Sequence, residues 1–212
     1  KIFSEGFAHQ KQSVRIVEKL EKGGRGLNLT WEVRDGILNH QLSGNPSTLE
    51  GKVVRYADKI AYINHDVDDS IRAGIIREED LPDTYTDILG HSTRERLNTL
   101  IHDIVNQSKD KPDIQMSEDV EFAFRGMRKY MFENVYTNPR AKGEEQKAEN
   151  ILRELFQYYM EHPELLSTEY IERMWQSGET QERSVCDYIS GMTDQYAIAK
   201  FQEFFVPVAW RY

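Results

Sequence analysis

The sequence predicts an all-α protein. Seven stretches carry apolar residues at the three- and four-residue intervals of a helix, and none alternates convincingly like a strand. Clusters of Gly, Pro and polar residues fall between these stretches, for example SGNPSTLEG at 43–51 and SKDKPDIQ at 108–115, and such clusters are typical of loops. The chain contains no internal repeat and no low-complexity tract.

The first two predicted helices lie near the N-terminal end. The first covers 13–22 (SVRIVEKLEK) and ends at Gly23–Gly24, because glycine commonly closes a helix. The second covers 28–40 (NLTWEVRDGILNH), and either Asn28 or Thr30 is expected to be its N-cap.

The third predicted helix covers 53–69 (VVRYADKIAYINHDVDD) and begins after a loop. Its first half is apolar enough to be buried against other helices. The residues expected to bury it are Val53, Val54, Ala57, Ile60 and Ala61.

Four longer helices complete the prediction. They cover 91–108, 117–136, 142–163 and 182–205. The helix at 142–163 stops before a proline, which cannot continue a helix, and the last helix is expected to kink at Gly191. Helices of this length can form a core without any sheet.

Composition limits the classes of protein to which the chain can belong. It has 212 residues, enough for one large domain or one domain with an appendage, and 39% of them are hydrophobic. The 30% of charged residues, the mean hydropathy of -0.68 and the absence of a long apolar run exclude a transmembrane helix. The net charge of -9 argues against a nucleic-acid-binding protein. The single cysteine, Cys186, excludes an intramolecular disulfide, favours a cytoplasmic location and is expected to be buried.

Polar residues on the third predicted helix are the main candidates for a functional site. Asp58, Tyr62 and Asp66 are spaced by four residues, so they lie on one stripe of the helix. A carboxylate buried in such a helix is costly unless it is paired or binds a metal ion. Asp58 is therefore either a metal ligand or the partner of a neighbouring cation, Arg55 or Lys59.

Other polar residues are weaker candidates. His9 precedes the first predicted helix and either donates to a phosphate or is an ordinary surface histidine. The pairs His65–Asp66 and His102–Asp103 resemble metal-binding dyads but are short enough to arise by chance. Arg94 and Arg96, with His91, form a basic cluster that either meets phosphates or faces solvent.

Four segments, taken in order, resemble the bacterial dGTP triphosphohydrolase-like proteins of the HD superfamily. They are GFAHQKQSVRIVEKLE (6–21), GLNLTWEVRDGILNH (26–40), VVRYADKIAYINHDVDDSIRAG (53–74) and VCDYISGMTDQYAIAKFQEFF (185–205). The resemblance implies a helical, metal-dependent phosphohydrolase that converts a dNTP to a deoxynucleoside plus triphosphate. It also implies a homo-oligomer whose substrate is a dNTP, with dGTP as one candidate.

The resemblance assigns roles to five residues. The family pattern A-D-x-I-A-Y matches 57–62, so Asp58 corresponds to a ligand of a divalent metal ion, which could be Mn, Mg, Fe or Ni. Lys59 and Tyr62 correspond to residues that approach the triphosphate, and Asp66 to one that binds the deoxyribose 3′-hydroxyl. His9 corresponds to a histidine near the phosphates, with a role in proton transfer or charge stabilisation.

The chain departs from the family in one respect. The family's first metal-binding His and its His-Asp dyad precede the segment with which this sequence begins, at Lys1. We therefore expect an HD-like helical bundle that is incomplete at its N-terminus, with 1–108 as part of the phosphohydrolase core and 109–212 as a helical region packed on it. This chain alone should be inactive. The alternative is a nucleotide-binding or regulatory relative that has lost hydrolysis.

Overall fold

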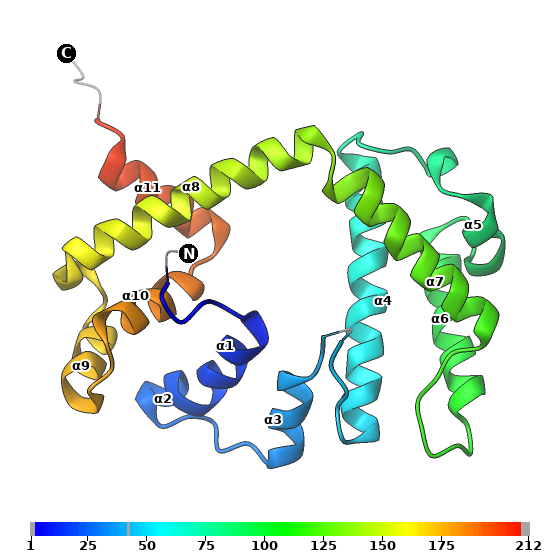
Figure 1. The fold of residues 1–212 in the computed structure, drawn as a ribbon, viewed down its shortest axis with the longest axis horizontal. Helices are drawn as coiled ribbons and strands as arrows, with labels where there is room; N and C mark the ends of the chain where they lie inside the picture. The colour runs from blue at the N-terminus through cyan, green and yellow to red at the C-terminus, as the bar shows by residue number, and fades with distance from the viewer. Residues whose placement is uncertain (1–2, 42, 209–212) are drawn as a thin grey trace. The chain divides into compact units, whose positions relative to one another are not determined.

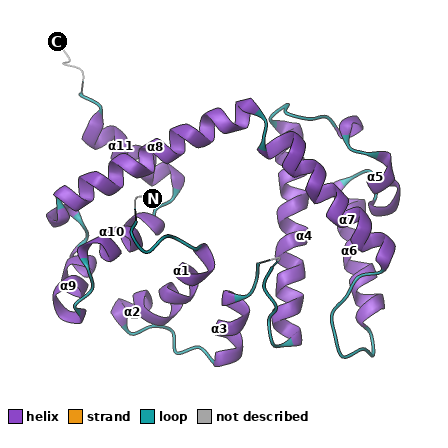
Figure 2. Cartoon of the chain, in the orientation of Figure 1, coloured by secondary structure: helices purple, strands orange, loops and turns teal. Residues whose placement is uncertain are grey.

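A computed structural model describes residues 3–41 and 43–208. Every regular element among these residues is a helix, and none is a strand (Figure 2), which confirms the all-α prediction. Within the same ranges, no helix combines the length and the apolar character needed to cross a membrane. Contacts divide the chain into two compact units, one of Leu29–Lys142 and one that joins Lys1–Asn28 to Gly143–Tyr212. This division differs from the boundary at 108–109 expected from the sequence, which stays a prediction.

The described residues of the unit Leu29–Lys142 form five α-helices and two short helices of other types (Figure 1). They are α3 (Trp31–Leu38), α4 (Leu49–Arg72), a 3-10 helix (Glu78–Asp80), α5 (Asp83–Leu89), α6 (Thr93–Ser108), α7 (Glu118–Met131) and a π-helix (Phe132–Tyr136). Its core joins α4, α6 and α7 through fully buried apolar side chains, among them Val67, Leu100 and Met127.

Helix α4 is the longest helix of this unit and is well capped. The Thr48 hydroxyl accepts a hydrogen bond from the Gly51 amide at 3.1 Å, which satisfies one of the free N–H groups of the first turn. Ile60, Ile63 and Val67 follow at helical spacing and are buried. The cap and this apolar stripe fix the rotation of α4, and so they also fix the direction in which its other faces point.

The second unit combines the N-terminal helices with α8 (Pro139–Glu161), whose first residues precede the division at Gly143, and with the helices after α8. They are α1 (His9–Arg15), a π-helix (Ile16–Leu20), α2 (Glu21–Gly24), α8, a 3-10 helix (Pro163–Leu165), α9 (Thr168–Ser177), α10 (Gln181–Ser190) and α11 (Asp194–Phe205). Its core is centred on Leu155, Tyr159 and Val185, which are fully buried, and aromatic side chains surround it.

The structure refines several predicted helices. The first begins at His9, and its end at Gly23–Gly24 is confirmed by positive φ angles at both glycines. The helix expected over 182–205 is interrupted after Ser190, so it forms two helices with separate caps. Helices α5 and α9 were not predicted. The aromatic C-terminal stretch FFVPVAWRY at 204–212 is, from its sequence, a candidate for an interface or for closing the core, and its Trp210 and Tyr212 lie outside the described residues.

The buried position of Cys186 on α10 confirms its expected role as a small core residue. Burial raises the pKa of the Cys186 thiol, so little of it is thiolate near neutral pH. We expect native Cys186 to react with a disulfide reagent at least roughly a hundredfold more slowly than in denaturant. The rate of thiol release measured with and without denaturant tests this. Fast stoichiometric reaction of the native protein would contradict it.

Candidate functional site

Helix α4 presents Asp58 and Tyr62 to solvent, whereas the side chain of Lys59 is only 19% exposed. The side chain of Asp58 is 45% exposed, and Tyr62 is also exposed. The prediction that Asp58 is buried is therefore wrong for this chain. The physical reason is the rotation of α4, which points Ile60 and Ile63 into the core and turns Asp58 away from it.

Apolar residues next to Asp58 are exposed as well. Of the five side chains expected to bury α4, only Ile60 is buried. The prediction is wrong for the other four, Val53, Val54, Ala57 and Ala61, which the residues of this unit leave exposed. We name the surface formed by Val54, Ala57, Asp58, Ala61 and Tyr62 the α4 face.

Asp58 pairs with the lysine that follows it. Its Oδ2 atom lies 3.0 Å from the Lys59 Nζ, and this Nζ lies 5.9 Å from the centroid of the Tyr62 ring. Arg55, the other partner considered from the sequence, donates instead to the Gly44 carbonyl at 2.6 Å. The carboxylate and the phenol of the α4 face thus have the Lys59 ammonium beside them.

Asp66 lies one turn beyond Tyr62 and is held by a residue that the sequence analysis did not single out. Tyr136, the last residue of the π-helix, donates its hydroxyl hydrogen bond to Asp66 Oδ2, and its ring centroid lies 6.3 Å from that of Tyr62. Burial, together with hydrogen bonds to Asp66 and Tyr62, raises the pKa of Tyr136, so its hydroxyl keeps its proton. Tyr136 therefore orients the end of the Asp58–Tyr62–Asp66 stripe.

The bond between Tyr136 and Asp66 gives a prediction. Tyr136→Phe removes the donated hydrogen bond and should lower the free energy of unfolding by about 1 kcal/mol. Urea unfolding followed by circular dichroism measures the change. Tyr130→Phe is the matched control, because no described hydrogen bond involves the Tyr130 hydroxyl, and it should change stability less. Equal effects of the two substitutions would show that the bond contributes nothing.

The remaining histidine candidates lie in different settings. His9 is the first residue of α1, in the other unit, and is exposed. His65 is exposed on α4 beside Asp66. The pair His102–Asp103 is structural in part, because Asp103 Oδ2 accepts a hydrogen bond from the Ser117 amide at 2.8 Å just before α7.

The two arginines of the basic cluster behave differently. Arg94 is exposed, as a solvent-facing arginine would be. Arg96 is only 2% exposed and donates to Glu78 Oε1 at 2.8 Å and to Asn64 Oδ1 at 3.2 Å. Arg96 therefore links α6 to α4 and to the 3-10 helix. The sequence predicted either a contact with phosphates or exposure to solvent, and the buried Arg96 side chain fits neither prediction.

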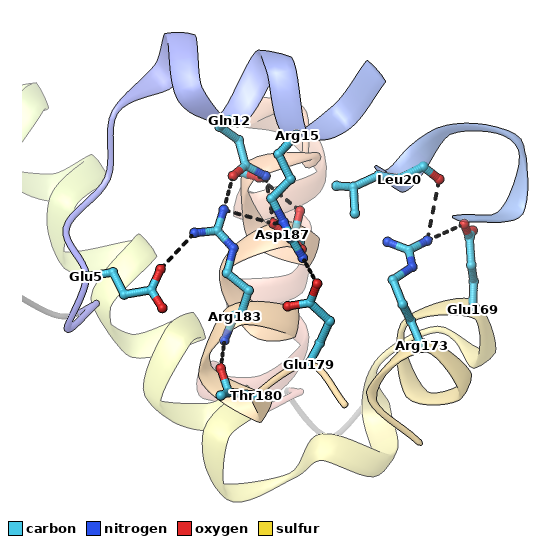
Figure 3. A network of polar contacts seen from close by, with 11 residues as sticks. Glu5, Gln12, Arg15, Leu20, Glu169, Arg173, Glu179, Thr180, Arg183 and Asp187 are labelled. Carbon is cyan, nitrogen blue, oxygen red and sulfur yellow. Dashed lines mark hydrogen bonds and ion pairs between the residues drawn. The ribbon is translucent and has the colours of Figure 1, made fainter. Parts of the chain in front are cut away.

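A second group of buried charges lies in the unit that contains His9 (Figure 3). Asp187 on α10 is 1% exposed and accepts hydrogen bonds from Arg15 Nη2 at 2.7 Å and from Gln12 Nε2 at 2.8 Å. Arg183 lies one turn earlier on α10. Its Nη2 atom lies 3.3 Å from Asp187 Oδ1 and also donates a hydrogen bond to Gln12 Oε1. Burial by itself lowers the pKa of Arg15, but Asp187 and Glu179 raise it overall, so the guanidinium stays charged.

The metal ion implied by the resemblance needs more ligands than this chain brings together. Throughout the described ranges, no group of three or more His, Cys, Asp or Glu side chains is placed to hold an ion. Asp58 offers one carboxylate, whereas divalent ions in proteins take several ligands. The described residues therefore do not form a complete metal site.

Comparison with protein families identifies part of the chain. Residues 114–203 match the family of phosphohydrolase-associated domains. The match covers α7, α8, α9 and α10 completely and all but the last residues of α11. It therefore includes both Tyr136 and Asp187.

Curated relatives extend the similarity to nearly the whole chain. A deoxyguanosinetriphosphate triphosphohydrolase-like protein of Caldanaerobacter subterraneus subsp. tengcongensis is 46% identical over 210 residues, covering 99% of this chain and 61% of that protein. One from Clostridium perfringens (strain SM101) is 47% identical over 215 residues, covering 95% and 61%. The resemblance found from the sequence is therefore confirmed. The chain spans about 61% of the length of these relatives.

Proposed function

We propose that this chain, as a homologue of the deoxyguanosinetriphosphate triphosphohydrolase-like proteins, forms part of a metal-dependent enzyme that hydrolyses a dNTP to a deoxynucleoside and triphosphate. The observation that carries the proposal is similarity over 95–99% of the chain, which includes the A-D-x-I-A-Y segment at 57–62. The geometry adds that Asp58 and Tyr62 share an exposed face of α4 and that the Lys59 ammonium lies beside both of them. Because the relatives carry dGTP in their name, it is the first substrate to test.

Lys59 and Tyr62 suit the binding of a triphosphate. An ammonium and a phenol hydroxyl both donate hydrogen bonds to phosphate oxygens, and the ammonium also supplies positive charge. Lys59 Nζ lies over the Tyr62 ring, so the two donors are close together. A phosphate would replace Asp58 as the partner of Lys59.

Asp58 would supply one ligand of the divalent ion once Lys59 turns to the phosphates. The other ligands would come from residues outside the described ranges. The exposed apolar side chains of the α4 face support this arrangement, because further protein packed on them would bury Asp58 in the way its role requires. Such packing would also strengthen the electrostatic interactions of the carboxylate.

Asp66 and His9 have separate proposed roles. Asp66 would accept a hydrogen bond from the deoxyribose 3′-hydroxyl while Tyr136 holds it in place, since a carboxylate accepts several hydrogen bonds. Water would attack the α-phosphorus, and the bond to the 5′-oxygen would break. That oxygen takes up a proton, and His9 would take part in the proton transfer.

The test is an assay of the complete protein that carries this chain. We expect release of triphosphate and deoxynucleoside from dGTP or another dNTP, lost on chelation and restored by a divalent ion. The 212-residue chain alone should release neither product. Binding of dNTP by the complete protein without product release would instead support a nucleotide-binding relative. Light scattering of the same sample would test the proposed homo-oligomer.

A further inference from the structure

A pocket of about 350 Å³ is formed by α9, α10 and α11. Its volume is at the lower end of the range of about 300–1,000 Å³ usual for small-molecule sites. One tyrosine from each of the three helices lines it, together with the turn between α10 and α11. The lining residues are Tyr170, Tyr188, Gly191, Met192, Thr193 and Tyr196. None of these six side chains is charged, so the wall of the pocket is neutral and mainly aromatic.

The three tyrosines of the pocket are held in fixed orientations. The ring centroids of Tyr170 and Tyr188 lie 5.3 Å apart, and the two ring planes are inclined at 71°. The hydroxyl oxygens of Tyr188 and Tyr196 lie 3.2 Å apart and share a hydrogen bond, which joins α10 to α11. Burial raises the pKa of both Tyr170 and Tyr188, so these two hydroxyls keep their protons at neutral pH.

Two of these rings already have cations over their faces. The Arg173 guanidinium lies 5.0 Å from the centroid of the Tyr170 ring, and the Lys200 ammonium lies 5.7 Å from that of the Tyr196 ring. Both distances are within the limit of about 6 Å for a cation–π interaction. Neither Arg173 nor Lys200 lines the pocket, so both leave it open. The tyrosine rings are thus placed to attract a further cation inside the pocket.

The charge of these two cations is balanced by neighbouring acids. Glu169 Oε1 lies 2.6 Å from Arg173 Nη2, and Glu203 Oε2 lies 2.8 Å from Lys200 Nζ. A positive group in the pocket would therefore meet little net repulsion from them.

The wall of the pocket favours one kind of cation. The six lining residues include no carboxylate that could accept hydrogen bonds from a primary ammonium or a guanidinium. Such a group would lose its hydrogen bonds to water without regaining them, which is costly. A quaternary ammonium group has no N–H donor to satisfy, and aromatic rings are the partners that bind it in proteins.

We propose that this pocket binds the quaternary ammonium group of a small molecule such as choline. Tyr170, Tyr188 and Tyr196 contact the cation with their rings, and Met192 adds its polarizable thioether to the wall. None of the lining residues belongs to the site proposed for dNTP hydrolysis. The proposal is therefore independent of that function.

Titration of the full 212-residue chain with choline at constant ionic strength tests the proposal, with binding followed by NMR of the backbone amides. We expect saturable shifts centred on the turn of Gly191, Met192 and Thr193. The matched ligand is the carbon analogue of choline, in which a tert-butyl group replaces the trimethylammonium group and so keeps its shape without its charge. It should bind at least roughly tenfold more weakly, because it makes no cation–π interaction.

Substitution of Tyr196, which is 42% exposed, tests the part played by its ring. Tyr196→Leu removes the ring and should weaken choline binding by at least roughly threefold, whereas Tyr196→Phe keeps the ring and should bind choline within about twofold of the unchanged chain. Phe132→Leu is the matched control, since it removes an exposed aromatic ring of the other unit, and it should leave binding unchanged.

Three results would overturn the proposal. They are the absence of saturable shifts, equal binding of choline and its carbon analogue, which would indicate a merely apolar pocket, and equal losses in Tyr196→Leu and Phe132→Leu. The amide spectra also report whether each variant is folded. If Tyr196→Leu does not fold, the comparison of the two ligands on the unchanged chain decides.

Discussion

Asp187→Ala should lower the free energy of unfolding by about 3–5 kcal/mol, because it leaves two largely buried guanidinium groups without their shared carboxylate. Arg15 and Arg183 are only 13% and 16% exposed, and each contacts Asp187 directly. Gln12, also buried, loses the same acceptor. The effect should lie near the lower limit, since Arg15 keeps Glu179 at 3.0 Å.

Urea unfolding followed by circular dichroism measures this loss. Asp187→Asn, which keeps the size of the side chain but removes its charge, should give a smaller loss of the same sign. Glu154→Ala is the matched control in the same unit, because Glu154 is exposed, and it should stay within about 0.5 kcal/mol of the unchanged chain. A similar small change for Asp187→Ala would mean that the buried carboxylate does not stabilise this unit.

Local helical patterns predicted most of the longer helices, but not the short helices or the contacts between distant segments. The helix expected over 91–108 corresponds to α6. It could be predicted because its apolar spacing and its N-cap, Ser92, are signals within the segment itself. Helix α5 escaped prediction because DTYTDIL is short and largely polar, and its packing against α7 decides its conformation. Propensity is a weak guide for such segments, since tertiary contacts override it.

The candidate site likewise has a part that local spacing predicts and a part that it does not. The stripe of Asp58, Tyr62 and Asp66 follows from spacing on a single helix and needs no knowledge of the fold. The partner of Asp66, Tyr136, stands 70 positions away, and that of Asp187, Arg15, stands 172 positions away. No local pattern predicts such pairs. The exposure of Asp58 could not be predicted from a local pattern either, since it depends on which other segments cover α4.

Because Asp58 is exposed in this chain, substituting it tests the proposed chemistry without disturbing the fold. In the complete protein, Asp58→Asn should reduce dNTP hydrolysis by at least about 10³-fold, equivalent to roughly 4 kcal/mol of transition-state stabilisation. The amide keeps the shape of the side chain but loses the charge that a divalent ion requires of a carboxylate ligand. Metal affinity, measured by titration, should fall together with the rate.

The fold of this chain should not be affected by the same substitution. Asp58 is 45% exposed and pairs only with Lys59 among the described residues, and a surface pair of this kind contributes at most about 1 kcal/mol. Asp69→Asn is the control on the same helix, since Asp69 is exposed and pairs with Arg72 at 3.0 Å. It should leave both hydrolysis and metal affinity unchanged. If Asp58→Asn also left them unchanged, Asp58 would be only a surface partner of Lys59, and the metal site of the enzyme would have to be sought elsewhere.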